Sequence, residues 1–82
     1  MPITYFIAGR DDAAAFDRLA DGVFDNAIIP ASLEVFLSDE RHHIALATCD
    51  KEVLGFASAV DYFHPDKPRE LWINEVGVAP AW

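Results

Sequence analysis

The residues best suited to chemistry are acidic and amide side chains set in or beside apolar segments. Glu75 and its neighbour Asn74 interrupt the otherwise apolar run 71–78, and Asp25-Asn26 lies in an irregular connector. Asp25 could bind an ammonium group, or the pair could form only an Asx-turn. Glu75 could simply face solvent or pair with a nearby arginine. Adjacent strand residues point to opposite faces, so Glu75 and Asn74 should act together only if a bulge re-aims one of them.

Three further groups of residues invite a functional interpretation. Tyr62, with His64 and Asp66, lies in a proline-bracketed stretch that could border a binding site or serve only as a turn. Asp39, His42 and His43 suggest a metal site, but the two histidines would point to opposite faces at a strand start and no further ligand lies at useful spacing, so we expect none. The single cysteine, Cys49, is expected to be a small buried hydrophobic residue, because no nearby basic cluster would lower its pKa.

Hydrophobic spacing places these residues on two helices and four strands. Phe16, Leu19, Ala20 and Val23 recur at i, i+3, i+4 and i+7, which predicts an amphipathic helix, and Pro30 suits the first turn of a second one. Runs of β-branched and aromatic residues predict strands. We expect helices at about 12–21 and 30–38 and strands at about 3–8, 43–49, 53–60 and 71–78.

The connections complete this picture. Asp50-Lys51-Glu52 is a predicted three-residue turn between the second and third strands, which should pair in antiparallel fashion. Residues 61–69 contain Pro65 and Pro68, which predicts a loop. Gly77 near the end of a strand is typical of a bulge or of close backbone approach by a ligand. The order strand, helix, helix, strand, strand, strand predicts one α+β domain over residues 1–82 with a mostly antiparallel sheet.

Composition restricts the class of partner. The 82 residues include 14 acidic and six basic side chains, for a formal net charge of −8. This charge opposes binding to nucleic acid or to an anionic membrane and favours small cationic molecules, although it could serve solubility alone. A single cysteine, no basic leader and no long apolar run predict a cytoplasmic protein.

The end of the fourth strand reads Val76-Gly77-Val78-Ala79-Pro80-Ala81-Trp82. With the order of elements, it resembles the Gcn5-related N-acetyltransferase (GNAT) superfamily over nearly the whole chain, as the N-terminal half of that fold. Within the superfamily, shorter stretches look like the aminoglycoside 3-N-acetyltransferase type, namely residues 24–26, 30–33, 36–39, 42–43 and 71–76. In such proteins the next loop reads Arg/Gln-x-x-Gly-x-Gly/Ala and binds the pyrophosphate of coenzyme A. This loop is not among the 82 residues. We therefore expect the 82 residues alone to transfer acetyl groups poorly.

The resemblance implies roles for particular residues. Acetyl-CoA would be the acetyl donor and a small amine the acceptor. Glu75 would draw in or deprotonate the amine, and the amide of Val76 would stabilise the oxyanion. The donor would lie along Val76, Gly77, Val78 and Ala79, and the acceptor would contact Asp25, Asn26, Tyr62 and Glu75.

Two other hypotheses remain open. The chain could be a non-catalytic half-fold that acts as a binding or assembly module through the exposed fourth strand, or an unrelated small acidic α+β domain. If the fourth strand has no outer neighbour, its free N–H and C=O groups should promote strand pairing or domain exchange between copies, which predicts a homo-oligomer.

Overall fold

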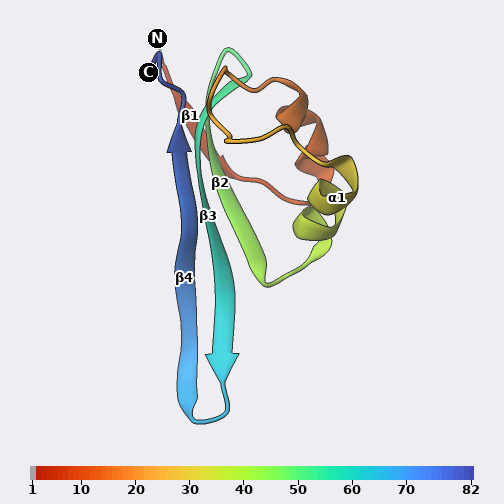
Figure 1. Ribbon diagram of the computed structural model, residues 1–82, viewed down its shortest axis with the longest axis vertical. Coiled ribbons are helices and arrows are strands. Elements are labelled where there is room, and N and C mark those ends of the chain that lie inside the picture. Colours follow the sequence, from red (N-terminus) through yellow and green to blue (C-terminus); the bar gives the residue numbers. More distant parts are fainter. Residues whose placement is uncertain (1) are drawn as a thin grey trace.

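Four strands form one antiparallel sheet in the order β1-β2-β3-β4 (Figure 1). The computed structural model describes residues 2–82. In chain order the elements are β1 Thr4–Ile7, the 3-10 helix η1 Arg10–Asp17, α1 Pro30–Ser38, β2 His42–Cys49, β3 Glu52–His64 and β4 Lys67–Val78. The predicted α+β class and antiparallel sheet are confirmed. No helix within residues 2–82 is both long enough and apolar enough to cross a membrane.

The core lies between one face of the sheet and the two helices, which Figure 1 shows on the same side. Alternate residues of the central strands, including Ile44, Leu46 and Phe56, point into this core and are buried, as is Phe16 of η1. The opposite face carries small residues at its centre and exposed apolar residues such as Ile7 and Val76 at its margins. One face is therefore packed and the other is open.

The first helix differs from the predicted one. The predicted α-helix at 12–21 is a 3-10 helix at Arg10–Asp17, and the chain leaves it to run beside β3. The N–H of Val53 donates to the carbonyl of Arg18 at 2.7 Å, and the N–H of Ala20 donates to the carbonyl of Val53 at 2.9 Å. These bonds to β3 compete with a last helical turn, which is why the apolar spacing was misleading here. The second helix, α1, begins at Pro30 and ends at Ser38.

The turn between β2 and β3 is shorter than predicted. Asp50 and Lys51 have φ of 50° and 68°, and Cys49 pairs directly with Glu52. Two successive positive φ values are those of a type I′ turn, whose twist matches that of the strands it joins. The turn therefore has two residues, and Glu52 belongs to β3.

The predicted loop at 61–69 is wrong. β3 continues to His64 and β4 begins at Lys67, so the two strands form one long hairpin that projects beyond the helices (Figure 1). Pro68 is accommodated because the register shifts between Tyr62 and His64, which places the proline at an irregularity in the ladder. The guanidinium of Arg69 adds a 3.0 Å ion pair across the hairpin to Asp61.

Candidate functional site

A β-bulge in β4 determines which side chains can act together. Ser58 pairs with Glu75 and Ala59 pairs with Ile73, so Asn74 is an extra residue without a partner on β3. At such a bulge the alternation of faces is interrupted. Asn74 and Glu75 consequently both line one pocket, instead of pointing to opposite faces.

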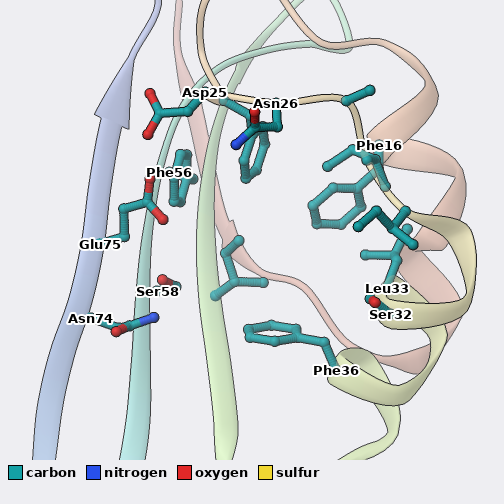
Figure 2. Close-up of a pocket in the computed structure, with 15 residues that line it drawn as sticks. Phe16, Asp25, Asn26, Ser32, Leu33, Phe36, Phe56, Ser58, Asn74 and Glu75 are labelled. Atoms are coloured by element: carbon teal, nitrogen blue, oxygen red, sulfur yellow. The ribbon is translucent and has the colours of Figure 1, made fainter.

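This pocket lies between β3–β4 and the helical layer, and its volume is about 430 Å³. That volume falls within the roughly 300–1,000 Å³ typical of small-molecule sites. The lining combines residues of η1, the connector 24–29, α1 and the strands β2, β3 and β4 (Figure 2). They are Phe16, Phe24, Asp25, Asn26, Ala27, Ile28, Ile29, Ser32, Leu33, Phe36, Ile44, Phe56, Ser58, Asn74 and Glu75.

Two carboxylates lie on the same side of the pocket. Figure 2 shows the side chain of Asp25 directed toward β4, where Glu75 and Asn74 project into the pocket. Asp25 and Glu75 are both exposed, and the pocket lining contains no lysine, arginine or histidine. The site is therefore acidic and reachable from solvent, which suits a cationic ligand.

The connector that carries Asp25 and Asn26 is anchored to the core by the two residues that precede Asp25. Val23 is buried, and the ring of Phe24 stacks on that of Phe56 with centroids 4.1 Å apart and planes inclined by 9°. An offset or parallel aromatic contact of this kind contributes about 0.5–1.5 kcal/mol beyond the burial of its area. The two residues before Asp25 thus fix the connector against the first half of β3, at Phe56.

Tyr62 lies elsewhere. It is on the projecting part of β3, opposite Glu70, and is not among the residues that line the pocket. Its side chain is exposed. A role for Tyr62 in acceptor binding remains a prediction.

The outer edge of β4 offers backbone donors beside the pocket. The N–H of Ala79 donates to the carbonyl of Leu54 at 2.8 Å, which makes these two residues a hydrogen-bonded pair. Such pairs alternate with non-hydrogen-bonded pairs along an antiparallel ladder. The pairs that contain Val76 and Val78 are of the second type. Their N–H groups therefore point away from β3 toward the open edge.

Ala79 is less suited than its neighbours to bind a ligand. Besides its N–H bond to Leu54, its carbonyl accepts a 2.9 Å hydrogen bond from the N–H of Trp82, and its side chain is buried. The N–H and the carbonyl of Ala79 are thus both engaged within the chain, and a contact between Ala79 and the acetyl donor stays a prediction.

Gly77 is required by packing within the chain. A Cβ at this position would lie 2.5 Å from the Phe56 ring and 2.5 Å from the carbonyl oxygen of Val23. The close backbone approach that the sequence suggested is thus made by the protein itself. A contact between Gly77 and the donor substrate stays a prediction.

The residues considered as metal ligands have other partners. Asp39 accepts hydrogen bonds from the backbone N–H of Arg41 at 2.9 Å and from its guanidinium at 3.3 Å. These hydrogen bonds hold the pKa of Asp39 below its ordinary value of 3.8. The His42 ring lies against Phe36, with centroids 5.1 Å apart. Within residues 2–82 no three His, Cys, Asp or Glu side chains come together to bind a metal.

Two solved structures share this arrangement of strands and helices. A ribosomal-protein-alanine N-acetyltransferase from Brucella melitensis biovar Abortus 2308 aligns with a TM-score of 0.69 at 19% identity, over 98% of this chain and 59% of its own. An aminoglycoside acetyltransferase from an uncultured soil metagenomic sample aligns with a TM-score of 0.73 at 16% identity, over 99% of this chain and 60% of its own. The chain has a partial GNAT fold.

Sequence comparison gives a different and weaker likeness. No family model matches the chain. D-alanine–D-alanine ligases from Prochlorococcus marinus strains NATL1A and NATL2A are each 26% identical over 74 residues, which is 89% of this chain and 21% of the ligase. The chain thus spans a small part of these curated relatives. The GNAT likeness, which extends over nearly all of the described chain in three dimensions, is the one that bears on the fold.

Sequence reasoning missed several residues of the pocket. Ser58 is buried opposite Glu75, and the rings of Phe24 and Phe56 form part of the wall. A serine within the apolar run 53–60 was a usable signal, since a polar side chain in a buried strand calls for an explanation. The contribution of the aromatic rings had no such signal, because phenylalanine in an apolar run indicates only a core.

Proposed function

We propose that this chain forms the amine-binding and acetyl-positioning part of a GNAT-type N-acetyltransferase. The observation that carries the proposal is the bulge in β4. It turns Asn74 and Glu75 into an acidic pocket, and the next residues, Val76 and Val78, have N–H groups at the open edge of the same strand. An acceptor site and a row of backbone donors are therefore adjacent on one strand.

The acetyl donor fits the edge of β4 as an additional strand would. A pantetheine arm contains two amide groups, and the edge of β4 at Val78 could pair with one of them as it would with a neighbouring strand, which leaves the N–H of Val76 for the acetyl carbonyl. Exposed side chains of both valines add apolar surface beside this edge. In this proposal acetyl-CoA is the second substrate, and it lies along Val76, Gly77 and Val78.

The proposed reaction is direct transfer of the acetyl group. Asp25 and Glu75 attract the protonated amine, and Glu75 accepts a proton from it through water. The free amine attacks the thioester carbonyl, so that an N–C bond forms while the C–S bond breaks. The N–H of Val76 donates to the carbonyl oxygen as negative charge develops on it. The coenzyme leaves as a thiolate, which takes up one proton, and the amide nitrogen loses its second one.

The acceptor in this proposal is a small molecule with a primary amine and a positive charge. Aminoglycosides are one candidate class, because the sequence resembles the 3-N-acetyltransferase type and one structural neighbour is an aminoglycoside acetyltransferase. The net charge of −8 and the two pocket carboxylates support a cationic acceptor.

The test measures acetyl-CoA-dependent transfer to an amine, and release of the coenzyme thiol is the signal that is monitored. We would assay the 82-residue chain beside a version extended through the downstream reading frame, with a panel of primary amines. Glu75→Gln should lower kcat/KM by roughly 10²–10⁴-fold if Glu75 is the base. Glu70→Gln is the matched control, since Glu70 is an exposed residue of the same strand outside the pocket. Equal activity of the two variants would exclude the proposed role of Glu75, and a complete lack of transfer would refute the proposed function.

An assembly module is the second candidate, and the open edge of β4 favours it. This edge strand has 12 residues, and the sheet ends there within the described chain. Long edge strands are templates for pairing with another chain. Such a module would bind its partner through β4 without acetyl transfer, which the same assay distinguishes.

A further inference from the structure

The pocket is chemically divided. Its polar side chains gather toward β3 and β4, where Asp25, Asn74 and Glu75 surround one end (Figure 2). The opposite end is formed by η1 and α1, and there Phe16, Leu33 and Phe36 face the cavity, with Ser32 at its side. A ligand that fills the pocket would therefore meet charge at one end and hydrocarbon at the other.

Four phenylalanine side chains contribute to the lining. They come from η1, the connector, α1 and β3, and are Phe16, Phe24, Phe36 and Phe56. Phe24 and Phe56 are stacked on each other, and the rings of Phe16 and Phe24 are 6.2 Å apart at an angle of 46°. Phe16 and Phe36 present their rings at the helical end, whereas Phe56 lies beside Glu75 (Figure 2). Aromatic walls favour flat apolar groups and, near a cation, add a favourable charge–quadrupole interaction.

A polyhydroxylated amine does not match this lining. Each hydroxyl that enters an apolar wall without a hydrogen-bond partner costs about 1–3 kcal/mol by protein mutational data. At the helical end Ser32 is the polar side chain among the labelled residues, whereas Phe16, Leu33 and Phe36 offer no polar atom (Figure 2). An aminoglycoside such as kanamycin, whose rings carry many hydroxyl and amino groups, would leave several of them unpaired there.

We propose that the acceptor is a primary amine joined by a short linker to an aromatic or bulky apolar body. This inference rests on the proposed function, because it names the substrate class of the same site. The ammonium lies between Asp25 and Glu75 at the β4 side, where the donor edge begins. The apolar body lies against Phe16, Leu33 and Phe36. Asn74 and Ser58 remain at the polar end, where they can hydrogen-bond the nitrogen or the water beside it.

The experiment measures amine binding by the 82-residue chain in the absence of acetyl-CoA. Calorimetric titrations at neutral pH would compare 2-phenylethylamine, ethylamine, 2-phenylethanol and kanamycin. Burial of a phenyl group predicts about tenfold or greater tightening of 2-phenylethylamine over ethylamine. Loss of the positive charge should make 2-phenylethanol weaker than 2-phenylethylamine, and kanamycin should be weaker as well.

Single substitutions would show whether the amine binds in this pocket. Glu75→Gln should weaken 2-phenylethylamine, whereas Glu70→Gln, outside the pocket, should not change its affinity. Phe36→Leu keeps the pocket apolar but removes one ring, so it should weaken the aromatic amine while leaving ethylamine unchanged. Val35→Leu is its control on α1, because Val35 is exposed and does not line the pocket. Circular dichroism would establish that each variant is folded.

The outcomes separate this inference from the proposed function. Selective binding of 2-phenylethylamine that depends on Glu75 and Phe36 supports the inferred ligand class of this pocket, and absence of acetyl transfer by the extended chain would then refute the proposed function alone. Tighter binding of kanamycin, or acetylation of aminoglycosides but not of arylalkylamines by the extended chain, overturns the substrate class while the proposed function stands. If none of the amines binds, the inferred substrate class is overturned as well.

Discussion

Replacement of Gly77 by alanine tests the packing that holds β4 against the connector. The added Cβ would lie 2.5 Å from Cε1 of Phe56 and 2.5 Å from the carbonyl oxygen of Val23. The carbonyl belongs to the backbone and cannot rotate away, and the Phe56 ring is stacked on Phe24 at 4.1 Å. Relief therefore requires β4 or the connector to move.

Overpacking of this kind destabilises proteins by about 1–3 kcal/mol. At about 0.05–0.15 kcal/mol per residue, the whole domain has roughly 4–12 kcal/mol of stability. We expect Gly77→Ala to lower the melting temperature by about 4–8 °C for each kcal/mol lost. The phenylalanine stack and the pocket wall should loosen at the same time.

Thermal denaturation followed by circular dichroism would measure this effect. Gly9→Ala is the control, because its Cβ would meet only the Asp12 carboxylate at 3.8 Å, an ordinary contact. We expect Gly9→Ala to stay within about 0.5 kcal/mol of the parent protein, as surface substitutions usually do. If Gly77→Ala and Gly9→Ala melt at the same temperature, the close packing of β4 against Phe56 and Val23 is refuted.

Three further predictions concern the surface. The pKa of Asp39 in the folded protein is depressed, mainly by its side-chain hydrogen bond with Arg41. This pair therefore stabilises the fold at pH values above 3.8, the ordinary pKa, and the stabilisation is lost as the pH falls through the lower folded pKa. In an NMR titration, Arg41→Gln should raise the pKa of Asp39; an unchanged value would contradict this cause. Lys51 has φ of 68°, so Lys51→Gly should stabilise the turn by about 0.5–1 kcal/mol in urea denaturation, and a lower midpoint would count against it. If copies associate through β4, Val76→Lys should reduce the sedimenting mass and Ser38→Lys should not, whereas a parent chain that is already monomeric would remove this interface.

Several elements follow from local patterns in the sequence. Alternating apolar residues placed β2 and the first part of β3, and Pro30 with the residues after it placed α1, because side-chain period and proline geometry act within a few residues. These signals were sufficient for the α+β class and for the likeness to the GNAT fold. They also directed attention to Asp25 and Glu75, since a carboxylate beside apolar residues is visible without a structure.

The misplaced boundaries have physical causes that lie outside the segment concerned. The first helix ends at Asp17 because the next residues hydrogen-bond to Val53, which is more than 30 positions away. The hairpin at 61–69 persists because Pro68 falls at an irregularity of the ladder and Arg69 pairs with Asp61 across it. Proline normally indicates a loop, and only the partner strand shows that this one is tolerated.

The site depends on contacts between segments that are distant in the sequence. A bulge is a relation between two strands, so no property of residues 71–78 alone revealed that Asn74 and Glu75 share a face. The direction of the Val76 and Val78 N–H groups likewise follows from the bond between Ala79 and Leu54, not from their own residue types. Pairing register converts the order of residues into the positions of side chains and donors, and that register is set by contacts between distant parts of the chain.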